Sequence, residues 1–242
     1  MSRFENALLK AKNNPAFNGS IGTLSEKTLH SVLKYYLEPC DDFHEVSVDG
    51  YYADIMRDGC ITEIQTRAFD RLREKLSAFL PKYPVTVVYP LIANKTYFVI
   101  DESSGEISKP KKSPKHQNIY DIFDELYKIK MHLCSKNLYF HFVLLDVTEY
   151  RKKVKKSRNN HKGYETLERI PERILREIYI DGASDLAKLI PTSLKKEFTS
   201  LDFANAAGIS RGTAQTALNI LTHVSVLKRV GKQKNAYLYE II

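Results

Sequence analysis

The chain has 242 residues, with 37 Lys and Arg against 29 Asp and Glu and a net charge of +8. This length is sufficient to bury a core without disulfides or a structural metal, and it allows one large domain or two smaller ones. No apolar run is long enough to cross a bilayer, so a membrane protein is not expected. Three widely spaced cysteines without a signal-peptide pattern indicate a reducing, cytoplasmic environment.

The positive charge is unevenly distributed. Residues 1–150 contain 19 Lys and Arg against 20 Asp and Glu, whereas residues 151–242 contain 18 against 9. A concentrated positive excess is typical of proteins that meet a polyanion. Nucleic acid is therefore the expected partner of the carboxy-terminal part.

The first third of the chain passes from a helical to a strand-like pattern. Apolar spacing predicts a helix over 24–37, which ends before Pro39, and this helix places Glu26 and His30 on one polar face. For both residues the alternative is a solvated helix surface. Strand-like runs then follow at 43–48, 51–57 and 60–66.

The middle of the chain continues with alternating helices and strands. Helical spacing returns at 68–82 and 119–133, and strand patterns occur at 85–92, 96–101 and 138–147. The run at 85–92 is almost continuously apolar, as in a central strand that is covered on both faces. This order predicts a mixed α/β sheet with helices on its faces.

A tight hairpin is predicted around Asp58-Gly59, a strong turn pair, and it brings Asp54 and Glu63 together. Two carboxylates held in this way can bind a divalent metal. By the two-residue strand period, Gln65 and Arg67 are expected on the same face as Glu63. The alternative is that Asp54 and Glu63 are ordinary polar positions on an exposed hairpin.

Two lysine-rich segments interrupt the pattern. Residues 106–117 are expected to form a loop in which Lys111, Lys112 and Lys115 grip a phosphate backbone near the carboxylates, or are simply solvated. Residues 151–162 contain seven basic residues and no acid, and we expect a basic linker at 151–164 between two domains.

The carboxy-terminal segment predicts two helices separated at Gly208, with Ser210 as the N-cap of the second helix. Residues 226–241 then alternate around Gly231 and a basic turn, which predicts a β-hairpin. Residues 165–242 therefore resemble a winged helix-turn-helix domain. An alternative use of this fold is protein contact or dimerisation.

If this domain binds DNA as winged helices commonly do, its second helix and wing would carry the contacts. Arg211, Thr213 and Gln215 would face the major groove, where Arg and Gln can hydrogen-bond to base edges. The wing would meet phosphates through Lys228, Arg229, Lys232 and Lys234.

The order of elements from about residue 20 to 147 resembles the PD-(D/E)xK nuclease superfamily, the fold of many restriction enzymes and Holliday junction resolvases. The resemblance implies that Asp54 and Glu63 hold Mg²⁺ or Mn²⁺, and that Glu26 matches a helix acid of some branches. Gln65 stands where the family usually has a catalytic lysine, although some members carry Glu or Gln there. Three nearby residues are candidates for the missing cation, namely Arg67, Arg73 and Lys75.

The sequence therefore predicts an α/β protein, with a restriction endonuclease-like domain at 1–150 and a smaller winged-helix α+β domain at 165–242. The expected function is metal-dependent DNA hydrolysis, with Asp54, Glu63, Gln65 and Glu26 in the catalytic site. The alternatives are a catalytically silent DNA-binding regulator and a module that contacts only proteins. A homodimer is compatible with the resemblance, because related nucleases often pair to cut both strands.

Overall fold

The structure is a computed structural model that describes residues 1–13, 24–101, 104–154 and 163–242, with only the backbone described for 24–27. It contains two β-sheets. The larger is a mixed seven-stranded sheet in the order β1-β2-β3-β4-β6-β7, with β5 paired to β4. The smaller has three strands in the order β8-β10-β9. The predicted mixed α/β architecture is confirmed at this level.

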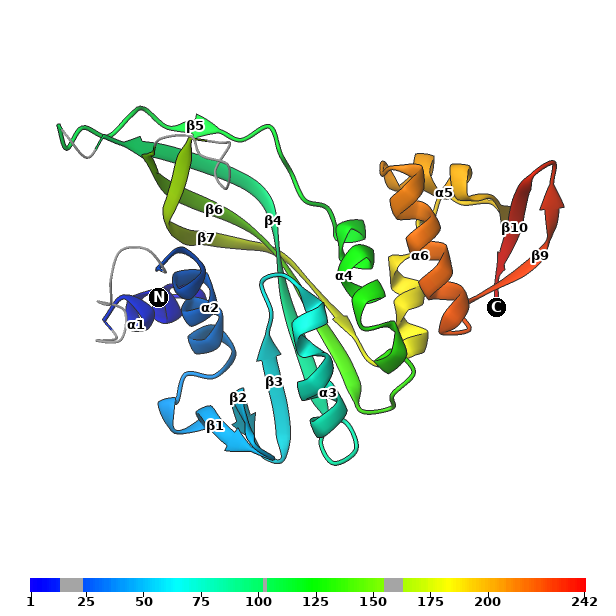
Figure 1. The fold of residues 1–242 in the computed structure, drawn as a ribbon, viewed down its shortest axis with the longest axis horizontal. Coiled ribbons are helices and arrows are strands. Elements are labelled where there is room, and N and C mark those ends of the chain that lie inside the picture. The colour runs from blue at the N-terminus through cyan, green and yellow to red at the C-terminus, as the bar shows by residue number, and fades with distance from the viewer. Residues whose placement is uncertain (14–23, 102–103, 155–162) are drawn as a thin grey trace.

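The larger sheet has helices on both sides. Its strands are β1 (His44–Val48), β2 (Tyr51–Arg57), β3 (Cys60–Ile64), β4 (Val85–Ile100), β5 (Lys111–Lys112), β6 (Leu138–Lys153) and β7 (Tyr164–Ile180). The accompanying helices and 3₁₀ turns are α1 (Arg3–Asn13), α2 (Leu24–Leu37), η2 (Asp41–Phe43), η3 (Phe69–Leu72), α3 (Arg73–Phe79), η4 (Ile119–Asp121), α4 (Ile122–Lys128) and η5 (Lys130–His132). Figure 1 shows α1 and α2 on one side of this sheet and α3 and α4 on the other. No helix in the described part of the chain is long and apolar enough to span a membrane.

Burial on both sides explains the apolar run in β4. Val85 and Val87 belong to the core shared with α3 and α4, whereas Val88 packs with Leu29 and Leu33 of α2. Because strand side chains alternate between faces, a strand covered on both sides needs apolar residues at successive positions.

The β2–β3 hairpin turns at Asp58 and Gly59, which both adopt positive φ as the turn pair predicts. Its ladder runs from the Arg57–Cys60 pair to the Ile55–Thr62 pair. On its other edge, β3 pairs in parallel with β4. Asp54 and Glu63 therefore lie one residue beyond the last pair of the hairpin ladder, in the middle of the sheet.

β4 and β6 are longer than the sequence predicted. The strands expected at 85–92 and 96–101 form one strand, with a register shift between Ile92 and Asn94 that coincides with the break in the pattern. β6 continues past residue 147 to Lys153. The two strands pair in parallel along almost their whole length.

The boundary between the two sheets differs from the expected linker at 151–164. Residues 151–153 end β6, and β7 pairs antiparallel with β6, so residues 164–180 belong to the larger sheet rather than to a winged-helix domain. Charged residues and Pro171 obscure the strand pattern of β7. They are tolerated because β7 is an edge strand, where one side of the backbone needs no ladder partner.

The positive charge is spread over both sides of this boundary. Residues 151–180 contain ten Lys and Arg against four Asp and Glu, a surplus of six. Residues 181–242 contain eight against five, a surplus of three. Four of the ten basic residues at 151–180 lie in 155–162, outside the described residues, so the described part of this stretch has six Lys and Arg against four Asp and Glu.

The smaller unit contains the expected helix pair and hairpin. Its elements are η6 (Ala183–Leu189), β8 (Glu197–Phe198), α5 (Ser200–Ala207), α6 (Arg211–His223), β9 (Leu227–Gln233) and β10 (Ala236–Ile241). Thr199 and Asp202 form a reciprocal capping box at α5, which ends at Gly208 in the left-handed conformation. Ser210 caps α6 by accepting a hydrogen bond from the Thr213 N–H.

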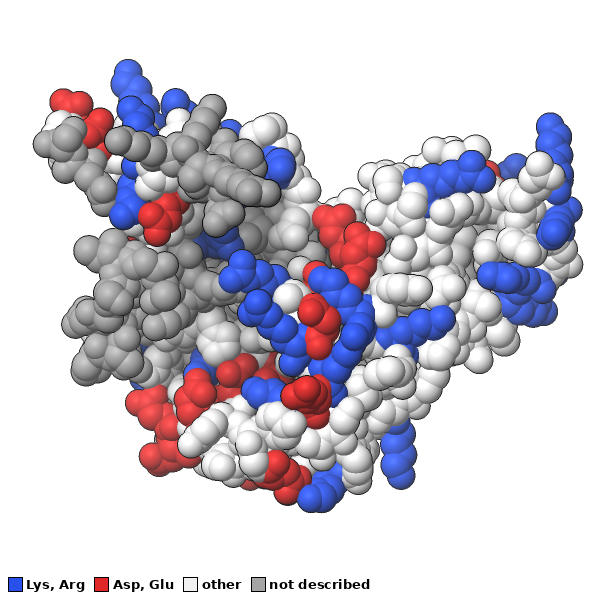
Figure 2. All heavy atoms as spheres, in the orientation of Figure 1, with Lys and Arg blue, Asp and Glu red and all other residues white. Residues whose placement is uncertain are grey.

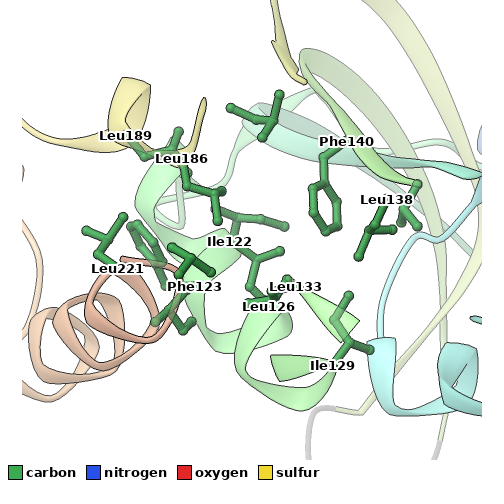
Figure 3. Packing of buried hydrophobic residues seen from close by; sticks show 14 of the residues in the cluster. Ile122, Phe123, Leu126, Ile129, Leu133, Leu138, Phe140, Leu186, Leu189 and Leu221 are labelled. Atoms are coloured by element: carbon green, nitrogen blue, oxygen red, sulfur yellow. The ribbon is translucent and has the colours of Figure 1, made fainter. Parts of the chain in front are cut away.

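The hydrophobic residues of the smaller unit pack against α4 of the larger one (Figure 3). Phe123 and Leu126 of α4 lie in one continuous cluster with Leu221 of α6 and with Leu186 and Leu189 of η6. At the edge of this contact, Lys130 Nζ donates to Oδ1 of the Asn219 side chain at 2.8 Å. The two sheets are therefore joined by a shared core.

Two expected helices are divided. Ala68 adopts a left-handed φ of 58°, and η3 precedes the short α3, so the helix expected at 68–82 is shorter. The segment expected as a helix at 119–133 consists of η4, α4 and η5. A 3₁₀ turn also brings residues three apart to one side, so the apolar spacing did not reveal the division.

Candidate metal and nucleic-acid site

Asp54 is held by contacts from two elements at the point where the β2–β3 ladder ends. Its Oδ2 accepts hydrogen bonds from the Ile64 N–H at 2.7 Å and from His30 Nε2 at 3.2 Å. Burial raises the pKa of Asp54, but the hydrogen bonds from His30 and Ile64 outweigh it and hold the pKa below its ordinary value. Asp54 is therefore a fixed carboxylate at neutral pH.

Glu63 is buried beside Asp54, with only 3% of its side chain exposed. Lys75 of α3 donates to Glu63 Oε2 at 2.8 Å and to the Tyr52 carbonyl oxygen at 2.6 Å. Burial and then the charge of Asp54 raise the pKa of Glu63 to about 7, although Lys75 opposes this shift. Glu63 Oε1 is buried and has no hydrogen-bond partner among the described residues.

Gln65 is the first residue after β3, which ends at Ile64, and its N–H still donates to the Val88 carbonyl oxygen of β4 at 2.9 Å. Its Nε2 donates to the carbonyl oxygens of Arg67 and Ala68, so the amide supports the turn that leads into η3. Gln65, which stands where the related nucleases usually have lysine, thus uses its side-chain amide to bind backbone carbonyl oxygens.

Of the three cations expected to replace the signature lysine, Lys75 is the one that contacts a carboxylate of the pair. Arg73 Nε instead donates to the Lys128 carbonyl oxygen at 2.6 Å and ties α3 to α4. Arg67 is exposed in the turn after β3.

α2 contributes two residues that sequence reasoning undervalued or missed. For His30 a solvated helix surface was left open as the alternative, whereas its side chain contacts Asp54. Lys34, one turn further along α2, forms an ion pair with Glu45 and helps to lower the pKa of Asp54. Their four-residue spacing on the helix that carries Glu26 was the available signal. The backbone of Glu26 lies in α2, but its side chain lies outside the described residues.

The carboxylate pair suits a divalent cation. An unpartnered buried oxygen is costly, and burial together with the Asp54 charge raises the pKa of Glu63, so a bound cation would offset both effects. The described residues contain no group of three or more His, Cys, Asp or Glu side chains that could hold an ion. Two carboxylates are nevertheless a sufficient protein contribution for Mg²⁺, which usually keeps water and phosphate oxygens as its other ligands.

The expected base-reading residues divide into two kinds. Arg211 and Gln215 lie on the exposed surface of α6, and neither side chain forms a hydrogen bond or ion pair within the described chain. Thr213 is instead engaged at the start of α6, where its N–H donates to Ser210 Oγ and the two hydroxyl oxygens lie 3.0 Å apart.

The four wing cations are exposed, namely Lys228, Arg229, Lys232 and Lys234. Arg229 and Lys232 lie over the ring of Tyr237, at 4.5 and 5.0 Å from its centroid, and Lys228 pairs with Glu240 at 3.1 Å. The wing is therefore a cationic surface supported by aromatic side chains.

Lys111, Lys112 and Lys115 are exposed, but the first two lie far from the carboxylates. Lys111 is opposite Tyr97 on β4, whereas Glu63 is opposite Val87, ten residues earlier and roughly 30 Å away along the strand. Figure 2 shows Lys and Arg side chains gathered over α3, on the wing and toward the β5 end of the sheet. These lysines thus extend the charged surface without joining the candidate metal site.

Comparison with known proteins concerns mainly the larger sheet. The family described as "Domain of unknown function (DUF8091)" matches residues 27–181. The chain belongs to this family. The matched residues run from α2 to the end of β7, so they contain Asp54, Glu63 and Lys75 and stop before the smaller unit.

A relative from Treponema pallidum (strain Nichols), described as "Uncharacterized protein", is 31% identical over 160 residues. The aligned part is 66% of this chain and 62% of that protein, so the chain spans less than two thirds of the relative's length. No solved structure matches this chain.

Proposed function

We propose that this protein is a metal-dependent deoxyribonuclease that hydrolyses phosphodiester bonds, with the smaller unit helping it to hold DNA. The observation that carries the proposal is the contact of Lys75 with Glu63, next to Asp54. The PD-(D/E)xK nucleases, which the sequence resembles, combine two acids with a cation. Lys75 supplies the cation that Gln65 lacks, from the helix that follows the hairpin.

The arrangement of strands supports the same assignment. An antiparallel β1-β2-β3 meander is followed by α3 and by β4, which pairs in parallel with β3. This is the order in which the resemblance places the two acids. The carboxylates lie where the hairpin ladder ends, and there the Ile64 N–H donates to Asp54 Oδ2.

The residues of the site have separate roles in this proposal. Asp54 and Glu63 would hold Mg²⁺ or Mn²⁺, which when bound polarises the phosphate and lowers the pKa of a bound water. Lys75 Nζ, fixed by Glu63 and the Tyr52 carbonyl, would orient that water or stabilise negative charge on the phosphate. His30 acts through Asp54 and is a positioning residue.

A DNA-binding protein without catalysis is the second candidate, and two contacts favour it. The amide of Gln65 is turned to backbone carbonyls, and the ammonium of Lys75 already occupies one oxygen of Glu63, where it competes with a metal. In that case Arg211, Gln215 and the wing would provide the function.

A cleavage assay separates the two candidates. Supercoiled plasmid, linear duplex and branched junction DNA are incubated with Mg²⁺ or Mn²⁺ and the wild type, Glu63→Gln or Asp54→Asn. We expect the wild type to cut at least one substrate and both variants to lose that activity. Equal activity in Glu63→Gln would overturn the nuclease assignment, and salt-sensitive binding without cleavage would support the second candidate.

A further inference from the structure

Three cations surround one buried acid where β4, β6 and β7 of the larger sheet lie side by side. Glu149 of β6 is 1% exposed. Arg169 donates to its Oε2 from Nε and Nη2, at 3.1 and 2.9 Å, Arg151 Nε donates to its Oε1, and Lys95 Nζ lies 3.5 Å from Oε2. Thr166 adds a hydroxyl contact to Oε1 at 3.3 Å.

One carboxylate cannot neutralise three cations, so the cluster has a surplus of two positive charges. Among the described residues, Lys95, Arg151 and Arg169 form no ion pair with any acid other than Glu149. Their side chains remain 18%, 22% and 27% exposed, so each cation contacts Glu149 and still reaches solvent in part. The ring of Tyr97 lies 4.2 Å from the Arg151 guanidinium and restricts it further.

The pKa of Lys95 is consistent with this surplus of positive charge. Burial lowers the pKa of Lys95; Glu149 opposes this effect, and the charges of Arg169 and Arg151 add to it. A structural ion-pair network would balance its charges, whereas Glu149 is the one acid that this cluster contacts in the described part of the chain.

The cluster lies beyond the part of the sheet that α2 covers. Val143, Leu145 and Val147 pack on the face that meets Leu29 of α2, and Glu149 is the next residue on that face. The Thr28 hydroxyl donates to Glu168 of β7 at 3.3 Å, which places the start of α2 beside the residue that precedes Arg169. The cations are therefore on the side of the sheet from which His30 reaches Asp54.

We propose that Lys95, Arg151 and Arg169 form a binding site for a phosphate group of a nucleic-acid backbone. Glu149 is a positioning residue that holds the two guanidinium groups, whose planar N–H pairs match phosphate oxygens. The choice of nucleic acid rests on the proposed function. It also rests on the neighbouring Lys111 and Lys112 of β5, which extend the positive surface beside Tyr97.

The distance to the candidate metal site fits a bound duplex. Glu63 is opposite Val87, and Lys95 follows Val87 by eight residues on β4, or roughly 26 Å along the strand. One turn of duplex DNA is about 34 Å long. One phosphate at the cluster and another at the carboxylates would therefore lie within a single turn.

The test is DNA binding without metal. The variant Glu149→Gln/Arg151→Gln/Arg169→Gln removes both guanidinium groups together with the buried charge that needs them. Binding to a duplex of three turns, about 30 bp, is measured by fluorescence anisotropy in EDTA over a series of NaCl concentrations. We expect Kd to rise about tenfold and the slope of log K against log salt to decrease by about one.

Two further proteins keep the result interpretable. Lys136→Gln lowers the net charge by the same one unit at an exposed position before β6, and its affinity and slope are expected to match the wild type. Lys95→Gln leaves both arginines on Glu149, so it tests the site if the triple variant does not fold, and a loss of about threefold is expected. Affinity and salt slope equal to those of Lys136→Gln would overturn the proposal.

Titration with inorganic pyrophosphate distinguishes the source of the phosphate. If pyrophosphate binds the wild type but not the triple variant, and the DNA affinity of that variant is unchanged, the nucleic-acid assignment is overturned. The result does not depend on catalysis, because no cleavage occurs in EDTA. A wild type that binds DNA through the cluster but does not cut it would contradict only the nuclease assignment.

Discussion

Glu63 occupies an environment that disfavours its charged form, which is typical of a residue kept for chemistry rather than for stability. It is buried, it lies beside the charged Asp54, and one of its oxygens has no partner among the described residues. Lys75 relieves this only in part. The site therefore lowers the stability of the metal-free protein, and this cost can be measured.

Glu63→Gln should stabilise the metal-free protein at pH 8. A glutamate in the unfolded chain ionises near pH 4.5, whereas the folded pKa is about 7, so the unfolded state loses its proton first and stability falls as pH rises between these values. Removing the charge should increase the free energy of unfolding by about 1–2 kcal/mol, less than the full shift because Lys75 loses its partner. Urea denaturation in EDTA at pH 8 and pH 4.5 provides the measurement. A variant that is equally destabilised at both pH values would contradict this account of Glu63.

Lys75→Ala should reduce DNA cleavage by about 100-fold or more, because the donor next to the carboxylates is lost. Lys82→Ala is the matched control, since Lys82 lies shortly after α3 and pairs with Asp49 at the surface. The rate of plasmid nicking with Mg²⁺ is measured for both variants, with circular dichroism to verify folding. Comparable rates for Lys75→Ala and Lys82→Ala would remove Lys75 from the catalytic site.

Among the secondary-structure elements, the β2–β3 hairpin was predictable because the residues that specify it are close together in the sequence. The turn pair Asp58-Gly59 and the alternation around it fix the β2–β3 pairing and hence the neighbourhood of Asp54 and Glu63. The contact of Lys75 with Glu63 was only one of three possibilities, because it depends on the left-handed turn at Ala68 that begins η3. β7 was not predicted from the sequence. Its charged side chains, such as Arg169 and Arg173, form ion pairs with acids of β6, and these partners meet only in the folded protein.

α4 is the element on which both units depend. Phe123 is fully buried in the shared core, whereas Tyr127 on the same helix is 53% exposed. Phe123→Ala should lower the free energy of unfolding by about 3–5 kcal/mol, and Tyr127→Ala should change it by about 0.5 kcal/mol or less. Urea denaturation monitored by circular dichroism tests both variants. Similar losses for the two variants would contradict the packing of α4 between the sheet and α6.

At the scale of the whole molecule, the shared core changes the expected two-domain organisation. The family match ends at residue 181, where the larger sheet ends, yet the apolar side of α4 is covered by η6 and α6. The fold class was predictable from the order of elements. The common core was not, because the contact between α4 and α6 joins residues almost a hundred positions apart.

A fragment of residues 1–181 should therefore be less stable than the full chain. It exposes Phe123 and Leu126, and it should bind a hydrophobic dye and unfold at a lower temperature. The full chain should unfold in a single transition. Two separate transitions in the full chain, with the fragment as stable as the larger unit in it, would indicate independent domains.

Anomalous scattering from a crystal soaked with Mn²⁺ would show directly whether Asp54 and Glu63 bind a metal. We expect one peak within ligand distance of oxygens from both Asp54 and Glu63, with Lys75 still close to the pair. Mn²⁺ absent from this position, or bound only elsewhere while Lys75 keeps both its contacts, would contradict the assignment of a metal-dependent nuclease site.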